Sequence, residues 1–185
     1  IRRGRERGLS FRVVLTEAGA QFVTPLSLAS LSETKVYQDL FSLTDESEMG
    51  HIRLSREADL IVVAPATADI MAKLAHGLAN DLASTTLLAT TAPILLAPAM
   101  NKMMWQNGAT QANVALLKAR GIRMVGPDAG DLACGEVGAG RMAETPDILA
   151  AVNTLLGDGI LKGLKALVTS GPTLEPIDPV RYIAN

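Results

Sequence analysis

The stretch Asp59-Leu60-Ile61-Val62-Val63-Ala64-Pro65 decides the fold of this chain. It is almost continuously apolar, which is typical of a strand buried on both faces of a parallel sheet. Pro93-Ile94-Leu95-Leu96-Ala97-Pro98 repeats this pattern further along the chain. Residues 70–90 between the two runs are rich in alanine and predict a long helix that is divided near Gly77. A strand, a helix and a second strand in this order predict a parallel β-α-β unit.

The same alternation extends in both directions along the chain. Two shorter runs predict further strands at residues 11–16 and 122–125. Helices are predicted at residues 18–31 with a break at Pro25, 51–58, 102–120 and 147–156, and a polar surface loop at residues 34–48. This order of elements predicts an α/β fold with a doubly wound parallel sheet. Ligands of such sheets bind beyond the carboxyl ends of the strands.

Composition narrows the class of protein. The chain has 185 residues, enough for one domain with a real core, and 48% of them are hydrophobic but only 3% aromatic. The formal net charge is −2 and the arginines of residues 2–7 form the only basic cluster, which argues against nucleic acid as the main partner. The single cysteine excludes an internal disulfide and fits a reducing, cytoplasmic location. No apolar run reaches the ~18 residues that a membrane span needs.

Both ends of the chain predict neighbouring segments. Residues 1–8 contain no methionine and have the composition of the end of a helix, so we expect one strand and its loop to precede them in the natural protein. We predict one domain over residues 1–157, which lacks that first strand, and a linker over residues 158–163. Residues 164–185 then form the start of a second α/β domain, truncated before it can form.

The only cysteine, Cys134, lies in Ala133-Cys134-Gly135-Glu136-Val137-Gly138-Ala139-Gly140-Arg141-Met142. A free cysteine is most often a small buried hydrophobe. The surrounding glycines and charged residues argue against a core position here and favour a mobile loop. A thiol with a pKa of about 8.5 is mostly protonated at neutral pH, so it can donate a proton as readily as act as a nucleophile. We therefore predict a lid that carries a reactive thiol.

Two further motifs follow the two apolar strands. In Pro98-Ala99-Met100-Asn101-Lys102-Met103-Met104-Trp105, a carboxamide among methionines is typical of a polar recognition point, but Asn101 is also a good N-cap for the next helix. In Ala64-Pro65-Ala66-Thr67-Ala68-Asp69, small residues let a flat ring or a phosphate approach the backbone. Thr67 as an N-cap and Asp69 in the first turn are the simpler interpretation, and a helix N-terminus itself attracts anions.

The chain has two histidines, His51 and His76. A lone histidine such as His51 is more often a surface or capping residue than a catalyst, and we assign no role to His76. Neither histidine has a cysteine or carboxylate at the spacing of metal ligands, so we predict no metal site.

These motifs resemble those of the flavin-dependent cysteine decarboxylases, and among them the phosphopantothenoylcysteine decarboxylases. The resemblance covers almost the whole chain, and the asparagine motif followed by the cysteine motif is its specific part. The tail is similar to the start of a phosphopantothenate–cysteine ligase domain, over Thr169-Ser170-Gly171-Pro172-Thr173 and Ile177-Asp178-Pro179-Val180-Arg181-Tyr182-Ile183-Ala184-Asn185. Ligase activity is not expected from these 185 residues.

The resemblance implies a flavodoxin-like or Rossmann-like three-layer flavoprotein, a homotrimer or a larger assembly of trimers, with sites shared between subunits. It implies that FMN oxidises the cysteinyl thiol of 4′-phosphopantothenoylcysteine, CO2 leaves, and hydride and a proton return to give 4′-phosphopantetheine in coenzyme A biosynthesis. By the same resemblance His51 assists the oxidative decarboxylation, Asn101 holds the substrate carboxylate and Cys134 donates the last proton. A neutral carboxamide holds that carboxylate without a full ion pair, so loss of CO2 is not opposed.

The resemblance also implies contacts around the reacting groups. The residues expected to contact FMN are Thr16, Glu17, Ala18, Ala66, Thr67, Ala68, Asp69 and Ala99. The residues expected to contact the substrate are Met100, Asn101, Met104, Gly135 and Arg141.

Two other functions stay open. The first is another flavoprotein of the same fold that decarboxylates a different acid or transfers a prenyl group; the two motifs together argue against it. The second is a catalytically silent flavin-binding or regulatory subunit, or a truncated form. An absorption spectrum of the purified chain separates a flavin-bound protein from an empty fold.

Overall fold

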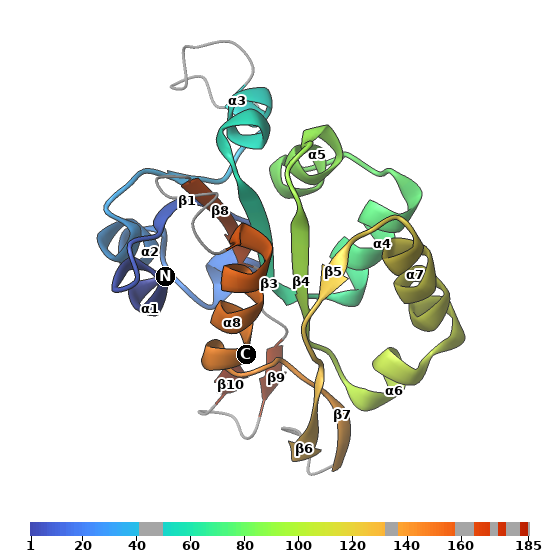
Figure 1. Ribbon diagram of the computed structural model, residues 1–185. Helices are drawn as coiled ribbons and strands as arrows, with labels where there is room; N and C mark the ends of the chain where they lie inside the picture. The colour runs from blue at the N-terminus through green and yellow to red at the C-terminus, as the bar shows by residue number, and fades with distance from the viewer. Residues whose placement is uncertain (41–49, 132–136, 158–164, 171–173, 177–181, 185) are drawn as a thin grey trace.

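A six-stranded parallel sheet forms the centre of the fold (Figure 1). The computed structural model describes residues 1–40, 50–131, 137–157, 165–170, 174–176 and 182–184. From one edge to the other, the strands of the sheet are β2 (Val36–Tyr37), β1 (Ser10–Leu15), β8 (Lys165–Ser170), β3 (Leu60–Ala66), β4 (Ile94–Pro98) and β5 (Arg123–Met124). Two antiparallel pairs lie outside this sheet, β6 (Asp128–Asp131) with β7 (Val137–Arg141), and β9 (Leu174–Pro176) with β10 (Tyr182–Ala184).

The helices connect successive strands. In chain order they are α1 (Arg2–Arg5), the 3-10 helix η1 (Gly19–Gln21), α2 (Pro25–Ser32), α3 (Gly50–Glu57), α4 (Ala68–His76), α5 (Leu82–Ala89), α6 (Lys102–Gln106), α7 (Gly108–Ala119) and α8 (Thr145–Leu156). None of the described helices is long and apolar enough to cross a lipid bilayer.

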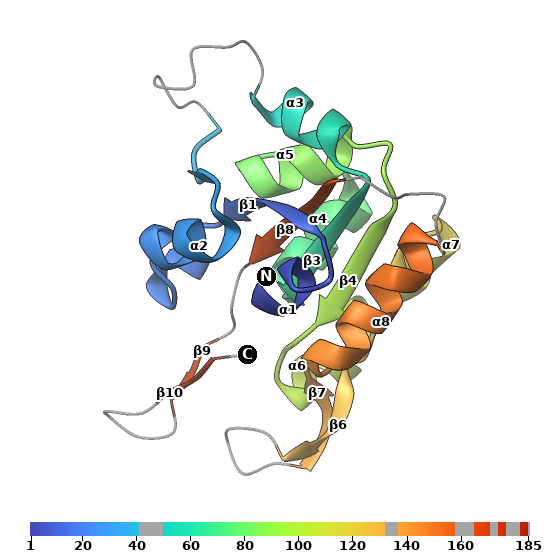
Figure 2. The same ribbon diagram turned by 60° about the vertical axis from the view of Figure 1, so that its left-hand side comes forward.

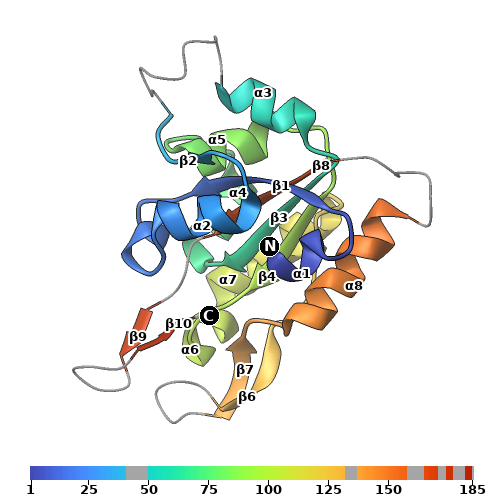
Figure 3. The same cartoon turned by 90° about the vertical axis from the view of Figure 1, so that its left-hand side faces the viewer.

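Helices cover both faces of the sheet because the central strands are apolar on both sides. On one face, Ile61 and Val63 of β3 pack with buried residues of α3, α4, α5 and α7. On the other face, Leu60 and Val62 pack against α8, and the alternate residues of β1 pack against α2. Figure 3 looks onto the face that α1, α2 and α8 cover. The result is the predicted three-layer, doubly wound α/β fold.

The predicted central elements are confirmed, with the long alanine-rich helix divided as expected. Gly77 ends α4 at φ +70°, a left-handed conformation that costs glycine little. The prediction of a single helix over residues 102–120 is wrong in one respect, because two helices, α6 and α7, cover this segment. Asn107 separates them: its Oδ1 accepts the Ala109 N–H at 2.9 Å and so starts α7 as a new helix.

Three short pairings were not predicted, one of them that of β9 with β10. Strand β2 lies within the segment predicted as loop and pairs with β1, Val13 opposite Val36; residues 41–49 of that segment lie outside the described residues. Strands β6 and β7 form a hairpin that flanks residues 132–136. Short strands with glycines and polar residues carry little periodicity, so their sequence resembles a loop.

Strand β8 lies between β1 and β3 in the centre of the sheet. Its backbone pairs in parallel with β1 from Ser10 opposite Lys165 to Leu15 opposite Ser170, and with β3 from Leu60 opposite Ala166. The sequence predicted this strand, but as the opening of a second domain. The division of the chain into two domains therefore stays a prediction.

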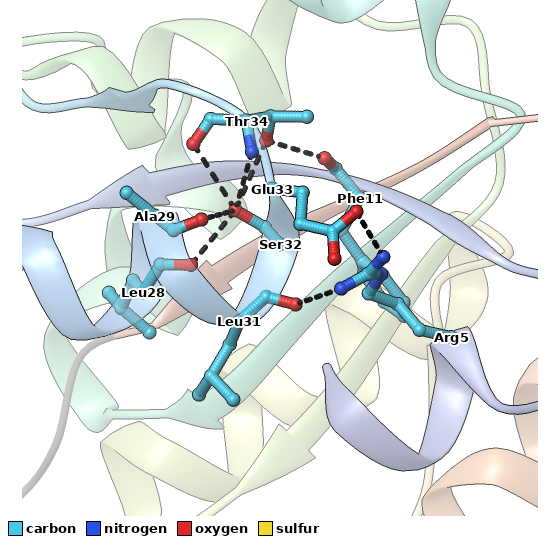
Figure 4. Close-up of polar contacts among 8 residues, drawn as sticks. All are labelled: Arg5, Phe11, Leu28, Ala29, Leu31, Ser32, Glu33 and Thr34. Atoms are coloured by element: carbon cyan, nitrogen blue, oxygen red, sulfur yellow. Dashed lines mark hydrogen bonds and ion pairs between the residues drawn. The ribbon is translucent and has the colours of Figure 1, made fainter.

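Polar contacts join α1 to the C-terminal end of α2, and the residues after α2 to β1 (Figure 4). The guanidinium of Arg5 in α1 donates to the Leu31 carbonyl at 3.1 Å and pairs with Glu33 at 2.5 Å. Thr34 then donates from its hydroxyl to the Phe11 carbonyl of β1 at 2.9 Å. Arg5 thus has a structural role in the arginine-rich start of the chain.

Candidate active site

A cavity of about 510 Å³ opens at the carboxyl ends of β1 and β3. Its wall includes Thr16, Glu17 and Ala18 after β1, and Thr67 and Asp69 at the start of α4. The segments after β2 and between α4 and α5 complete the lining. Its volume lies within the range of small-molecule sites, about 300–1,000 Å³. The cavity thus lies beyond the carboxyl ends of two strands, next to two of the segments that the sequence predicted for the site.

The N-terminus of α4 faces this cavity as a capped helix. Thr67 is the N-cap, and its Oγ1 accepts the Ile70 N–H at 3.3 Å. Thr16 plays a similar local part after β1, because its Oγ1 accepts the Gly19 N–H at 3.1 Å. Both threonines thus hold backbone turns at the rim of the cavity. The simpler interpretation of Thr67 as a cap is confirmed, and it leaves the helix N-terminus pointing at the cavity.

Three charged residues, Asp69, Lys73 and Asp81, form what we call the Lys73 network at the cavity wall. The Lys73 Nζ lies 3.0 Å from the Asp69 carboxylate and 2.8 Å from that of Asp81. Asp81 also caps α5, where its Oδ1 accepts the Ser84 N–H at 2.8 Å. The network therefore joins the start of α4 to the start of α5.

The contact between Lys73 and Asp81 shifts the pKa values of these two residues in opposite directions. The hydrogen bond to Asp81 raises the pKa of Lys73, against the smaller effect of partial burial. Burial opposes the charge of Asp81, but the hydrogen bonds from Lys73 and Ser84 together outweigh it and hold the pKa of Asp81 below its ordinary value. Both groups are therefore charged at neutral pH.

Asn101 lies in a turn after β4 that we call the Asn101 turn, residues 99–101. The Ala99 N–H donates to the Ala66 carbonyl at 3.1 Å, which joins this turn to the end of β3. The Asn101 Oδ1 accepts the Met103 N–H at 2.7 Å, so Asn101 is the N-cap of α6. Capping fixes the orientation of the carboxamide, because one of its two ends is engaged by the backbone.

The β6–β7 hairpin packs against the Asn101 turn and α6, and Figures 1 and 2 both show the two side by side. The Met100 N–H donates to the Gly140 carbonyl at 2.9 Å, and the Lys102 ammonium donates to the Val137 carbonyl at 3.1 Å. Arg141 follows Gly140, and its guanidinium pairs with Glu144 at 2.8 Å. Cys134 and Gly135 lie outside the described residues, between the two strands of this hairpin.

The predicted site residues do not all meet in one place. Thr16, Glu17, Ala18, Thr67 and Asp69 line the cavity. Ala66, Ala99 and Met100 are buried and do not line the cavity, whereas Met104 is 47% exposed. Among the described residues, no cluster of three or more histidine, cysteine, aspartate or glutamate side chains could hold a metal ion.

Helix α3, which carries His51, lies far from the hairpin. In all three ribbon views α3 is at one end of the sheet and the β6–β7 hairpin at the other. The order of elements explains this, because α3 leads into the start of β3 whereas the Asn101 turn follows the end of β4. A single chain thus does not bring the His51 backbone to the Asn101 turn.

Two known protein families match almost the whole chain. The flavoprotein family matches residues 1–157. The chain belongs to the flavoprotein family. Residues 161–185 of this flavoprotein match the C-terminal domain of the DNA/pantothenate metabolism flavoproteins. The boundary between the two matches falls in the predicted linker.

Two curated relatives of this flavoprotein share one description. The coenzyme A biosynthesis bifunctional protein CoaBC of Escherichia coli strain K12 is 48% identical over all of this chain and 46% of its own length. The protein of the same description from Haemophilus influenzae is 50% identical, over 100% of this chain and 46% of its own. The chain thus spans about half the length of the curated relatives it matches.

Solved structures share the fold of this flavoprotein. The FMN binding protein AtHal3 is 36% identical with a TM-score of 0.67, over 76% of this chain and 78% of its own. A cysteine-to-serine mutant of PPC decarboxylase, complexed with pantothenoylaminoethenethiol, is 32% identical with a TM-score of 0.66, over 76% of this chain and 80% of its own.

Reasoning from the sequence missed the Lys73 network of this flavoprotein. Part of its signal was present: Asp69 and Lys73 are four residues apart, the spacing of ion pairs on a helix. Asp81 followed three residues later by Ser84 is also a helix-start pattern. The contact between Lys73 and Asp81 crosses from one helix to the next, so no periodicity within either helix could reveal it.

Proposed function

We propose that this chain catalyses the FMN-dependent decarboxylation of 4′-phosphopantothenoylcysteine to 4′-phosphopantetheine, a carboxy-lyase step of coenzyme A biosynthesis. The observation that carries the proposal is the Asn101 turn, which lies at the carboxyl edge of the sheet against the hairpin that flanks Cys134. Relatives described as CoaBC match the chain over its full length, and a PPC decarboxylase shares its fold.

The residues of the cavity fit FMN. Small side chains and backbone turns at Thr16–Ala18 and Thr67 leave room for a flat ring, and the capped N-terminus of α4 suits a negatively charged or electron-rich group. Lys73 also lines the wall, where Asp69 and Asp81 pair with its charge. When bound, FMN supplies the acceptor for the hydride of thiol oxidation and later returns it. The chain's own residues hold the substrate and move its protons.

Asn101 holds the substrate carboxylate in this proposal. A carboxylate only accepts hydrogen bonds, so its recognition by Asn101 requires the Nδ2 group, the donor end of the carboxamide. A neutral donor binds the carboxylate without the full ion pair that would stabilise it against loss of CO2. Met100, Met104, Gly135 and Arg141 supply the remaining contacts to the substrate.

Cys134 donates the last proton in this proposal, and His51 assists the oxidative decarboxylation. The position of α3 at the opposite end of the sheet from the hairpin supports a site completed by His51 of a second copy. In this proposal the chain forms a homotrimer or a larger assembly of trimers, in which α3 of one copy meets the hairpin of another. The cytoplasmic location expected from the single cysteine stays a prediction.

Two measurements test the proposal in order. First, the purified chain is given excess FMN, and flavin fluorescence and thermal stability are followed; we expect both to change. Second, the loaded protein is given 4′-phosphopantothenoylcysteine, and release of CO2 and formation of 4′-phosphopantetheine are measured. FMN binding without release of CO2 would contradict the decarboxylase and favour a silent flavin-binding protein.

Cys134→Ser separates the roles of the thiol. If Cys134 only protonates the product, the steps before that protonation do not need it, so the variant should release CO2 and accumulate a product two hydrogens lighter than normal by mass spectrometry. General acid catalysis is typically worth about 100- to 10,000-fold, so the loss of final product should be large. A packing cysteine predicts normal turnover, and a nucleophile predicts no CO2.

A further inference from the structure

The contact between β7 and the Asn101 turn is made by backbone atoms on both sides. The Met100 N–H donates to the Gly140 carbonyl at 2.9 Å. A Cβ built on Gly140 would overlap the carbonyl oxygen of Met100 and would lie 3.5 Å from the carbonyl carbon of Asn101. Gly140 also has a φ of +157°, which side-chain-bearing residues rarely adopt. The close approach therefore depends on the absence of a side chain at this one position.

Gly138, two residues earlier on the same strand, provides an internal comparison. A Cβ built there would meet only the side chain of Lys102, with its Cδ at 2.5 Å. A lysine side chain is flexible and can move aside, giving up only the exposed hydrogen bond from its ammonium to the Val137 carbonyl, whereas the Met100 carbonyl is part of the backbone and cannot move without the turn. The same added methyl group thus has different consequences at the two glycines.

The Asn101 turn depends on this contact because α6 cannot hold it alone. Helix α6 has five residues, none of them buried, and Met103 and Met104 are 64% and 47% exposed. So short a helix is not stable by itself. The turn is held on its β4 side by the bond from Ala99 to Ala66, and on its other side by Gly140.

We propose that Gly140 is a positioning residue for Asn101, and that its missing side chain sets the place at which the carboxamide meets the substrate carboxylate. This inference rests on the proposed function of Asn101. Adding a methyl group at Gly140 displaces the Met100 carbonyl and, with it, the next residue. A displacement of about 1 Å in a reacting group can lower the rate about 100-fold.

Gly140→Ala tests this inference, with Gly138→Ala as the matched control. Binding of the carboxylate-bearing substrate is compared with binding of 4′-phosphopantetheine, which lacks that carboxylate. We expect Gly140→Ala to raise the KM of the substrate and lower kcat/KM by about 10- to 100-fold, while the dissociation constant of 4′-phosphopantetheine stays within about twofold. Gly138→Ala should stay close to the wild type in all three quantities.

A merely structural role for Gly140 predicts a different pattern. It would weaken the binding of both ligands equally, and that result would overturn the inference. A double variant with Asn101→Ala adds a second check: if Gly140 acts through Asn101, adding Gly140→Ala to Asn101→Ala should cost no further substrate affinity. Full additivity of the two losses would also overturn it.

One readout does not depend on the decarboxylase function. In Gly140→Ala, but not in Gly138→Ala, the Met100 amide should exchange with solvent at least about tenfold faster, and the Asn101 side-chain NH2 resonances should shift. If these signals stay unchanged, the inference is wrong whatever the reaction. If they change but the wild-type protein releases no CO2, the proposed function fails while the positioning of Asn101 stands.

Discussion

The Lys73 network and the Asn101 turn both lie at the carboxyl edge of the sheet, but different contacts hold them. Charged side chains join α4 to α5 in the network, through Lys73, Asp69 and Asp81. Backbone hydrogen bonds at Ala99 and Met100 hold the turn. The strength of a charged contact changes with pH and with screening. The strength of backbone packing changes only with the shapes of the groups that pack. The wall of the cavity and the residue expected to bind the substrate should therefore respond to different changes.

The largest effect is expected from a charge placed in the turn. Asn101→Asp keeps a good N-cap for α6, so the fold and FMN binding should survive. The new carboxylate repels that of the substrate by roughly 1–4 kcal/mol, depending on the local dielectric. Steady-state kinetics should show kcat/KM lowered by about 10- to 1,000-fold.

Asn107→Asp is the control for this substitution. Asn107 caps α7 through the same kind of hydrogen bond, from Ala109 N–H to its Oδ1, and it lies at the other end of α6. The Asn107→Asp variant should bind and turn over the substrate as the wild type does. Normal kinetics in Asn101→Asp would show that Asn101 does not bind the substrate. The expected difference between the Asn101 turn and the Lys73 network would then be wrong.

An intermediate effect is expected from removal of the cation of the network. Lys73→Met keeps the length of the side chain but leaves Asp81 without its ion pair. The free energy of unfolding should fall by about 1–2 kcal/mol, since Asp81 is partly exposed and water screens the pair. Denaturant unfolding of the variant measures this loss, and the exposed Lys118→Met serves as the control. A loss no larger than that of Lys118→Met would mean that the network contributes little to holding α4 and α5 together.

The smallest effect is expected from pH. The pKa of Asp81 is lowered by folding, so its stabilisation is present above about pH 4 and is lost as pH falls through its folded pKa. The pKa of Lys73 is raised, so its stabilisation is present below about pH 10 and is lost as pH rises through its folded pKa. The stability difference between wild type and Lys73→Met should thus be constant near neutral pH and shrink at both extremes.

Gly140→Ala provides the contrast for this pH series. Its effect arises from overlap with the Met100 carbonyl and involves no titrating group, so its stability difference from the wild type should not vary between pH 3 and pH 10 in the same unfolding experiments. A Gly140→Ala difference that follows the pH dependence of Lys73→Met would show that the two regions are coupled rather than held independently.

The sequence by itself determined the layers of the fold and the order of its motifs. The apolar runs at 59–65 and 93–98 are long enough to specify buried strands, and the caps at Thr67 and Asn101 are local patterns. These features depend on residues close together in the chain, so their pattern is legible without a structure. The resemblance of the asparagine and cysteine motifs to those of a known family then indicated the chemistry.

Tertiary structure decided what the local patterns could not. The pairing of Lys73 with Asp81, the place of β8 between β1 and β3, and the separation of α3 from the hairpin all depend on how distant segments pack. Gly140 is a further case. In the sequence it is one of several glycines near Cys134. In the fold, a Cβ added at Gly140 would meet backbone atoms, whereas a Cβ added at Gly138 would meet a side chain. A glycine's importance comes from the neighbour that its missing side chain admits, and only the packed structure identifies that neighbour.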